Sequence, residues 1–499
     1  MLTAGASNGS WNVGRCCLRS RLGDWRRPGT ALTVGSQPGE GGPWKRRKRC
    51  SGTWDLRRRS GTYDNGVSVV RIALIAPGSR GDVKPYIALG KGLQMAGQVV
   101  RLVTHQNFDT LVNSHGLEFW PIAGSVQDIA QSKEMSALLE RGNFLAVMSQ
   151  MAKEAERGAL ALAEGGLAAC EGMDLVLAGI GGLFVGLSLA EKFGIPFLQA
   201  YYIPFTPTQA YPSFLLPQLP SWFGGSLNRF SYHLTRQIMW QSFQSADKLA
   251  RQKVLGLPAA PFWGPYTVAR LHGYPILYGY SPSVIPPPSD WDANTHVTGY
   301  WFLDPAAGWT PPPALVEFLQ AGSPPVYVGF GSMSNRKPEE TADLILQALA
   351  RTHQRAIILS GWGGMHKADW PDSVFMLDSV PFAWLFPRVA AVVHHGGAGT
   401  TAAGLRAGVP SVVIPFFADQ PFWGRRVAEL GVGPAPIPRR KLTVERLAQA
   451  IESALSDQAM RQRASSLGSR IRAEDGVGCA VGIVRQIEKR GTAYLTPQA

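Results

Sequence analysis

The sequence has few of the features that mark membrane-spanning or disulfide-rich proteins. It contains no run of about 18 uninterrupted apolar residues, so no membrane-spanning helix is expected. Its five cysteines (Cys16, Cys17, Cys50, Cys170 and Cys479) include no Cys-x-x-Cys pair. This pattern argues against a zinc site and against a disulfide framework, and it fits a reducing compartment such as the cytoplasm.

Charge is also scarce, and it is unevenly distributed. Charged residues make up 17% of the 499 residues, and the formal net charge is +14. Residues 1–60 hold thirteen Lys/Arg against three Asp/Glu, a net of +10, which leaves +4 for the rest of the chain. Nucleic-acid binding is therefore not expected for the folded body. Residues 1–66 lack apolar periodicity and predict a disordered basic leader, either a targeting peptide, a polybasic arm or a segment without a role.

The most informative stretch is VVHHGGAGTTAAGLRAGVPSVVIPFFADQ at residues 392–420. Apolar runs at 390–393 and 411–414 predict two buried strands, with a helix at 400–407 between them. The glycines fall in the first strand-to-helix turn, where free backbone amides and the helix dipole bind phosphate groups. The alternative is an ordinary tight corner between a strand and a helix.

The rest of the chain alternates apolar strand patterns with helical patterns, which is typical of doubly wound parallel sheets. In the first half, strands are predicted at 67–76, 99–104, 175–178 and 196–200, and helices at 86–96 and 144–170, with a loop at 77–85. In the second half, strands are predicted at 326–330, 356–360 and 374–377, and helices at 338–350 and 420–430. The predicted boundaries are 1–66 leader, 67–290 first domain, 291–313 linker, 314–475 second domain and 476–499 final helix and tail. Within the linker, the alternative for residues 295–298 is a last strand of the first domain.

Residues 201–243 are unusually rich in aromatic residues and prolines. The loop part of this segment predicts either the wall of an apolar pocket or a piece of the core, and the pattern leaves both open. For the helix that follows, core packing is favoured, because aromatic residues at helical spacing usually face inward.

With the strands and helices of both halves of the chain assigned, the sequence resembles the GT-B glycosyltransferases that use nucleotide-activated sugars. It is most similar to the branch that holds sterol glucosyltransferases and bacterial antibiotic-aglycone glycosyltransferases. The resemblance rests on separate motifs that keep their order along the chain. The motifs are GSRGDVKP at 78–85, the aromatic loop at 202–212, VGFGSM at 328–333, GWGG at 361–364, VPFAWL at 380–385 and the stretch 392–420.

The resemblance implies an α/β GT-B architecture, in which two Rossmann-like domains face each other across a cleft. The donor is then expected in the carboxyl-terminal domain and the acceptor in the amino-terminal domain, with a helix near 478–489 crossing back. It also implies sugar transfer with inversion, which needs a general base. Asp82 occupies the position where many relatives have histidine, and it is the expected base. The alternative is that Asp82 only orders its loop, for example against Arg80.

The resemblance also assigns binding residues. Donor diphosphate binding is expected at Ser332, His395, Gly397, Gly399 and Thr400. Donor sugar binding is expected at Asp419 and Gln420, with a helix N-cap as an alternative or additional role for Asp419. Nucleoside binding is expected at Trp362 and Val380. Acceptor binding is expected at Arg80, Tyr202, Phe205, Thr206 and Tyr211.

No metal ion and no cofactor are expected, because no Asp-x-Asp motif lies near these loops and the family generally manages without a divalent ion. The co-substrate is expected to be a UDP-sugar, with glucose as the hexose. The acceptor is expected to be an apolar hydroxylated molecule such as a sterol, a lipid or a polyketide aglycone, which implies a cytoplasmic enzyme in peripheral contact with a membrane. The alternatives are a non-catalytic nucleotide-sugar-binding protein and a GT-B epimerase.

Overall fold

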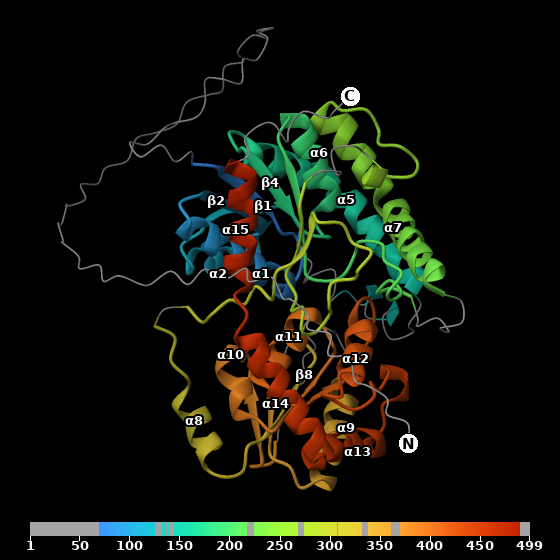
Figure 1. Ribbon diagram of the computed structural model, residues 1–499. Coiled ribbons are helices and arrows are strands. Elements are labelled where there is room, and N and C mark those ends of the chain that lie inside the picture. The colour runs from blue at the N-terminus through green and yellow to red at the C-terminus, as the bar shows by residue number, and fades with distance from the viewer. Residues whose placement is uncertain are drawn as a thin grey trace, which may run out of the picture. The chain divides into compact units, whose positions relative to one another are not determined.

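The computed structural model covers two parallel sheets and the helices around them (Figure 1). The described residues are 69–124, 132, 134–135, 137–138, 144–216, 224–267, 274–306, 308–331, 338–360 and 370–489. Both sheets belong to one compact unit. The predicted leader lies outside the described residues.

The amino-terminal sheet has seven strands in the order β3-β2-β1-β4-β5-β6-β7. Its strands are β1 (Arg71–Ile75), β2 (Val99–His105), β3 (Glu118–Ile122), β4 (Leu175–Ala178), β5 (Phe197–Tyr201), β6 (Ile276–Tyr278) and β7 (Thr295–Val297). Its helices are α1 (Arg80–Met95), α2 (Asp109–Asn113), α5 (Phe144–Cys170), α6 (Leu183–Phe193) and α7 (Gly224–Leu249). All neighbouring strands are parallel, and the central ones are apolar and buried because helices cover both faces.

The carboxyl-terminal sheet has five parallel strands in the order β10-β9-β8-β11-β12. Its strands are β8 (Val326–Gly329), β9 (Ala356–Leu359), β10 (Val374–Leu377), β11 (Ala391–His394) and β12 (Ser411–Val413). The helices here are α8 (Pro313–Gln320), α9 (Pro338–Arg351), α10 (Phe382–Leu385), α11 (Ala398–Ala407), α12 (Gln420–Glu429), α13 (Val444–Ser456), α14 (Gln458–Arg472) and α15 (Gly476–Lys489). The predicted doubly wound architecture is confirmed. Among the described residues, no helix has the length and apolar composition that a membrane span requires.

Helix α1 begins earlier than the sequence predicted. Residues 80–85 were expected in a loop, but the helix starts at Arg80 and contains Pro85. The Asp82 carboxylate accepts the backbone N–H of Ser79 at 2.6 Å, which caps the helix. Pro85 is the sixth residue of α1, beyond the first turn, so its missing N–H removes one backbone hydrogen bond from the helix.

The structure also adds strands that the sequence pattern did not show. β3 contains Pro121 and two half-buried aromatic residues, and β6 is only three residues long, so neither has a clear alternating or apolar pattern. β7, by contrast, lies where residues 295–298 were considered as a last strand of the first domain, and it pairs with β6 inside the segment predicted as a linker from residue 291. The amino-terminal sheet therefore extends into the predicted linker.

The chain passes between the two domains twice, and the two passages touch. Gly299, after β7, has a φ of +105°, and a Cβ there would lie 3.0 Å from the Cα of Gly476, at the start of α15. Close by, the Ser281 hydroxyl donates to the Glu474 carboxylate at 2.6 Å. Helix α15 then packs on α1 of the first domain (Figure 1).

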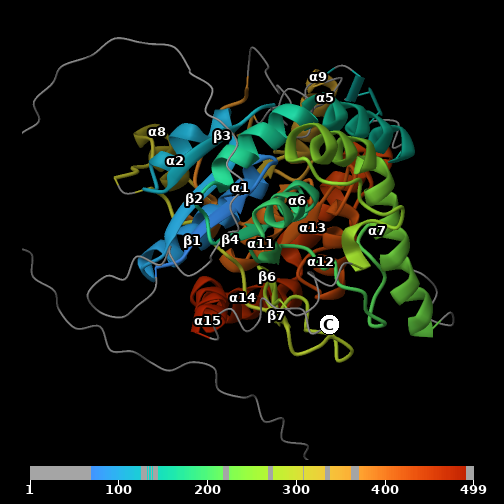
Figure 2. The same ribbon diagram turned by 90° about the horizontal axis from the view of Figure 1, so that it is seen from above.

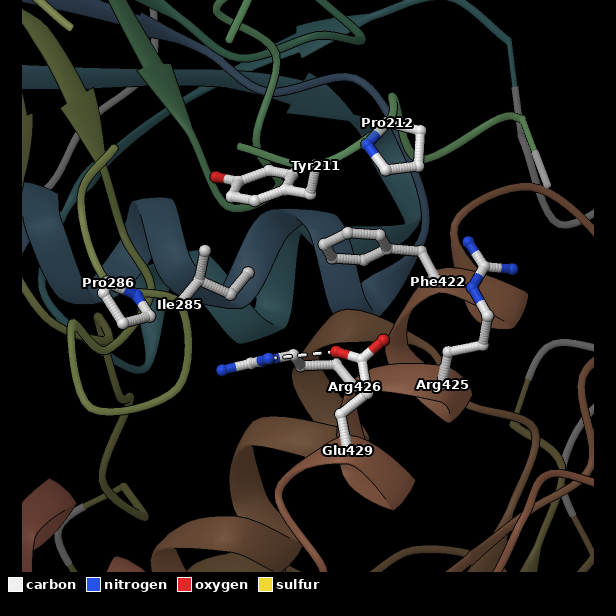
Figure 3. A pocket seen from close by; sticks show the side chains of 8 residues that line it. All are labelled: Tyr211, Pro212, Ile285, Pro286, Phe422, Arg425, Arg426 and Glu429. Carbon is white, nitrogen blue, oxygen red and sulfur yellow. Dashed lines mark hydrogen bonds and ion pairs between the residues drawn. The ribbon is translucent and has the colours of Figure 1, made fainter. Parts of the chain in front are cut away.

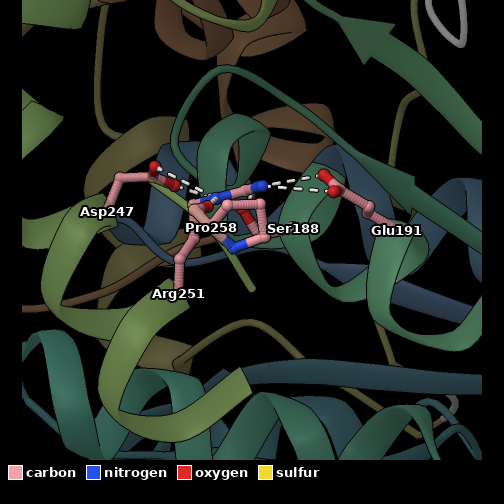
Figure 4. Close-up of polar contacts among 5 residues, drawn as sticks. All are labelled: Ser188, Glu191, Asp247, Arg251 and Pro258. Carbon is pink, nitrogen blue, oxygen red and sulfur yellow. Dashed lines mark hydrogen bonds and ion pairs between the residues drawn. The ribbon is translucent and has the colours of Figure 1, made fainter. Parts of the chain in front are cut away.

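A buried ionic network holds the turn that follows α7 (Figure 4). Arg251 is 6% exposed, donates to both carboxylate oxygens of Glu191 at 3.0 and 3.2 Å, and donates to Ser188 and the Pro258 carbonyl. Burial raises the pKa of the nearby Asp247 to about 6, although Arg251 and Ser188 oppose this. The guanidinium therefore joins three segments of the amino-terminal domain.

We expect Arg251→Lys to lower the free energy of unfolding by about 1–2 kcal/mol, because lysine keeps the charge but loses the planar, bidentate geometry. Urea denaturation read by circular dichroism measures the change. Arg229→Lys, on the exposed side of α7, is the matched control and should change stability by less than about 0.5 kcal/mol. Equal stability of both variants would contradict a central role for the network.

Candidate active site between the two sheets

Each sheet has a point where the strand order reverses, and the candidate site is built at these two points. In the first sheet β1 lies between β2 and β4, and in the second β8 lies between β9 and β11. Loops from neighbouring strands turn to opposite sides there, which opens a crevice for ligands. The amino-terminal ends of α1 and α11 meet at this place, because a Cβ at Gly399 would lie 3.8 Å from the Gly81 carbonyl oxygen.

The Gly-rich turn between β11 and α11 is shaped by close contacts. Gly396 has a φ of +88°, and a Cβ there would lie 2.6 Å from a β12 side chain, so glycine is required. Gly397 is the N-cap residue, and helix α11 begins at Ala398, two residues earlier than predicted. The first amides of a helix have no intrahelical acceptor, so this turn presents N–H groups suited to an anion. Thr400 is half-buried in the same first turn.

The two histidines before this turn are neutral at pH 7. Burial lowers the pKa of His394 to about 3 and that of His395 to about 4. His394 has a structural role, because its Nδ1 accepts the Gly396 amide at 3.0 Å. His395 lies against Gly331, in the turn after β8, and against Gly397. It therefore offers the predicted phosphate turn a neutral ring and no positive charge.

Asp82 is held by two partners. Besides the Ser79 amide on one oxygen, the other oxygen accepts the hydroxyl of Tyr202, in the predicted acceptor loop. The loop-ordering role considered for Asp82 is thus present, with Ser79 and Tyr202 as partners in place of Arg80. The carboxylate is only partly buried. Its position in the crevice is compatible with proton transfer as well as with ordering.

Asp419 comes from the other domain, at the amino-terminal end of α12. Its Oδ2 accepts the indole N–H of Trp423 at 2.9 Å, and no side-chain cap bond to α12 forms. Burial raises the pKa of Asp419 to about 7, and the negative charge of Asp82 adds to this increase. The two carboxylates therefore interact electrostatically from opposite domains. This arrangement leaves Asp419 oriented by Trp423 and not by a capping bond.

The other predicted donor-binding residues that the structure describes are engaged in contacts within the protein. The Gln420 side-chain oxygen accepts the amides of Phe416 and Phe417 at 2.8 and 3.2 Å, so it orders the loop before α12. Val380 is 7% exposed and packs beside α10. Ser332 and Trp362 lie outside the described residues.

Lys84 is a candidate site residue that sequence reasoning missed. Its ammonium lies 5.9 Å from the centre of the Phe382 ring in the opposite domain. Burial lowers the pKa of Lys84 to about 8, and the positive charge of Arg80 adds to this decrease. Its only sequence signal was a lysine inside the motif at 78–85. The contact with Phe382, which places it between the domains, required the structure.

Two of the predicted acceptor residues lie inside the first domain. Phe205 is 1% exposed, and its ring packs against Tyr201 and Tyr266, so the core interpretation applies to it. The Thr206 amide and hydroxyl both bond to the Tyr278 hydroxyl at 2.7 Å, which fixes the loop backbone. Phe205 and Thr206 therefore anchor the predicted acceptor loop to the core of the first domain.

Tyr202 and Tyr211 are half-buried, and Arg80 is exposed. The Tyr211 ring lies 6.4 Å from that of Phe422 on α12, so aromatic side chains of both domains meet here. Tyr211 and Phe422 line a pocket of about 100 Å³, shown in Figure 3. The pocket is lined by Tyr211, Pro212, Ile285, Pro286, Phe422, Arg425, Arg426 and Glu429. It is smaller than the roughly 300–1,000 Å³ of typical ligand pockets, so a polycyclic acceptor would need the domains to separate.

Comparison with known proteins places this geometry in a class. The solved structures of the kitacinnamycin glycosyltransferase and of CalG4, the calicheamicin glycosyltransferase, superpose with TM-scores of 0.62 and 0.60. They are 20% and 19% identical and cover 84% and 85% of this chain and 99% of each of those chains. The fold is therefore that of the GT-B glycosyltransferases.

Sequence comparison identifies the family within the GT-B glycosyltransferases. Residues 72–212 match the glycosyltransferase family 28 N-terminal domain, and residues 330–481 match the erythromycin biosynthesis protein CIII-like, C-terminal domain. Sterol 3-beta-glucosyltransferase UGT80B1 of Arabidopsis thaliana is 37% identical over 426 residues, which cover 83% of this chain and 67% of that protein. The chain belongs to the family of GT-B glycosyltransferases that includes the sterol 3-beta-glucosyltransferases.

The relatives differ greatly in length. The sterol 3-beta-glucosyltransferase of Cryptococcus neoformans is 36% identical over 446 residues, or 84% of this chain. The match spans only 27% of that protein.

Proposed function

We propose that this protein transfers glucose from UDP-glucose to the 3β-hydroxyl group of a sterol, with inversion at the sugar and with Asp82 as the general base. The observation that carries the proposal is that Asp82, oriented by Tyr202, lies close enough to Asp419 of the other domain for its charge to raise the pKa of Asp419. One carboxylate lies beside the predicted acceptor loop and the other beside the predicted phosphate turn. The names of the two relatives compared above, both sterol 3-beta-glucosyltransferases, support the sterol and the glucose.

The proposed donor site uses the amino-terminal end of α11. The amides around Gly397 and Gly399, with Thr400, His395 and Ser332, hold the diphosphate, while Asp419 and Gln420 bind the sugar hydroxyls. Trp362 and Val380 bind the nucleoside. This arrangement stabilises the negative charge that develops on the departing diphosphate, without a metal ion.

A direct test incubates the purified chain with UDP-glucose and a panel of 3β-hydroxysterols and polyketide aglycones, read by mass spectrometry. We expect hexosylated sterol, formed at the same rate with and without EDTA. Donor binding without any product would support the non-catalytic alternative. Interconversion of UDP-sugars without an acceptor would support the epimerase. Loss of turnover in EDTA would contradict the metal-free mechanism.

We further propose that Lys84 assists the diphosphate from the amino-terminal domain. Lys84→Met should lower kcat/KM for the donor by about 10–100-fold, since a hydrogen bond to a charged group contributes about 1.5–3 kcal/mol. Lys84 loses its proton as the pH rises through about 8, so the wild-type kcat/KM should decline above that pH. Lys84→Arg should keep activity and shift the decline to higher pH. A decline at the same pH in Lys84→Met would exclude Lys84 as its cause.

A sterol acceptor would be taken from a lipid bilayer. We therefore propose a cytoplasmic protein in peripheral contact with a membrane surface. The half-buried Tyr202 and Tyr211 and the exposed Arg80 are the proposed contacts with the acceptor, while Phe205 and Thr206 hold the acceptor loop in place.

A further inference from the structure

An unusual pair of exposed aromatic residues lies beside α7. Phe262 is 60% exposed and Trp263 is 67% exposed, at the two central positions of a turn closed by a hydrogen bond from the Gly264 amide to the Pro261 carbonyl at 2.9 Å. Gly264 has a φ of +82°, and a Cβ there would lie 2.8 Å from Trp240, so the turn is seated on a buried indole. Leaving two large apolar side chains in water is unfavourable unless something covers them.

The turn is attached firmly to the helix. The Phe262 carbonyl accepts the Trp240 indole N–H at 2.9 Å and side-chain amides of Gln237 and Gln241 at 3.3 and 3.0 Å. Three donors on one carbonyl hold the backbone of the turn against the helix. The turn is therefore an ordered part of the protein surface that carries two exposed aromatic side chains.

Helix α7 extends the same surface. Phe230 is 58% exposed and Leu234 is 39% exposed, one helical turn apart. Gln237 and Gln241 follow on that face at the next helical spacings, so the Phe262 carbonyl is held next to it. We call the surface formed by Phe230, Leu234, Phe262 and Trp263 the aromatic patch. Figures 1 and 2 show α7 on the outside of the amino-terminal domain, against α5.

The segment that carries the aromatic patch is basic, although the exposed Asp290 from the neighbouring loop interacts with Arg229. Residues 224–267 contain five Lys or Arg and a single acidic residue, Asp247, which is buried. Of the five, Arg229, Lys248 and Lys253 are exposed. Exposed Trp, Phe and Leu flanked by cations match the interface of an anionic bilayer, where aromatic rings lie at the level of the headgroups.

The aromatic patch also borders the proposed acceptor loop. The Asn228 side chain donates to the Gln209 carbonyl at 3.0 Å, and the Ser213 amide donates to the Ser231 hydroxyl at 2.9 Å. The first turns of α7 thus carry both the loop and the patch. We infer that the aromatic patch docks the protein onto an anionic lipid bilayer and places the acceptor loop at the membrane surface. The delivery of a lipid acceptor rests on the proposed function, but the docking does not.

Vesicle sedimentation of the full chain tests the docking, with phosphatidylcholine vesicles that contain or lack about one third phosphatidylserine, at low salt and at 0.5 M salt. The Phe262→Ser/Trp263→Ser double variant should bind at least about tenfold more weakly, because burying each ring contributes more than 1 kcal/mol. Met95→Ser, at an 86% exposed methionine on α1, is the matched control and should bind like wild type. High salt screens attraction through the basic residues 1–60 and leaves the contribution of the rings.

Equal binding of wild type and the double variant at both salt concentrations would overturn the inference. So would a concentration-dependent dimer that the double variant abolishes without any vesicle binding, because the patch would then serve a second copy of the chain. The assay needs no catalysis, so failure of the proposed transferase activity leaves its result readable. The circular dichroism spectrum and thermal unfolding of the double variant should match those of wild type, which checks that it is folded.

Discussion

Asp82→Asn should lower turnover by about 10²–10⁴-fold and leave UDP-sugar binding intact. The asparagine keeps an oxygen that accepts the Ser79 amide, so the start of α1 should stay capped. It cannot take a proton from the acceptor hydroxyl. Single-turnover rates with saturating donor, together with donor affinity by calorimetry, separate the two effects.

A second substitution distinguishes the base from the ordering role. If Asp82 only orders its surroundings, Asp82→Asn should be nearly as active as wild type, and only Asp82→Ala, which removes the cap, should be impaired. Asp109→Asn, at the start of α2 in the same domain, is a matched control expected to keep full activity. Wild-type turnover in Asp82→Asn would remove this residue from the role of base.

Asp419→Asn should have opposite effects on activity and stability. We expect kcat/KM to fall by about 10–100-fold, because the sugar loses a charged hydrogen-bond acceptor. In the free wild-type enzyme Asp419 ionises with a pKa of about 7, so its kcat/KM should decrease below that pH. The variant should lack this acidic decrease. A profile of kcat/KM against pH on both proteins measures it.

The stability effect follows from the same pKa. A carboxyl group whose pKa is raised in the folded state favours folding when protonated, and this contribution is lost as the pH rises from about 4 through about 7. Asp419→Asn should therefore be more stable than wild type at pH 8, by on the order of 2 kcal/mol after allowance for partial exposure. At pH 4 the two should be similar. A variant less stable than wild type at pH 8 would contradict the unfavourable burial of this charge.

The sequence alone was sufficient for the elements with strong local patterns. Strands β4 and β10 and helix α5 have the predicted bounds, because each is a continuous apolar run or a long helical period. Helix α1 was placed too late, because Pro85 was taken to end a loop, whereas the Asp82 cap starts the helix before it. β6 has only three residues and owes its existence to pairing with β5 and β7.

Candidate site residues could be named from the sequence, but their interactions with one another could not. Asp82 and Asp419 could be singled out as candidates, yet they are separated by more than three hundred residues. Their mutual effect on charge, the Tyr202 hydroxyl on Asp82 and the Lys84 contact with Phe382 depend on how distant segments meet. No local pattern contains that information.

The touching passages at Gly299 and Gly476 restrict how the two domains can move. A single connecting segment would allow the two domains to rotate relative to each other about any axis. Two connecting segments that touch each other restrict this motion. The domains can then rotate mainly about one hinge axis, which passes through the contact between Gly299 and Gly476. Since α15 is packed on the first domain beyond that contact, the sugar donor and the acceptor should approach along a fixed arc, always with the same faces toward each other.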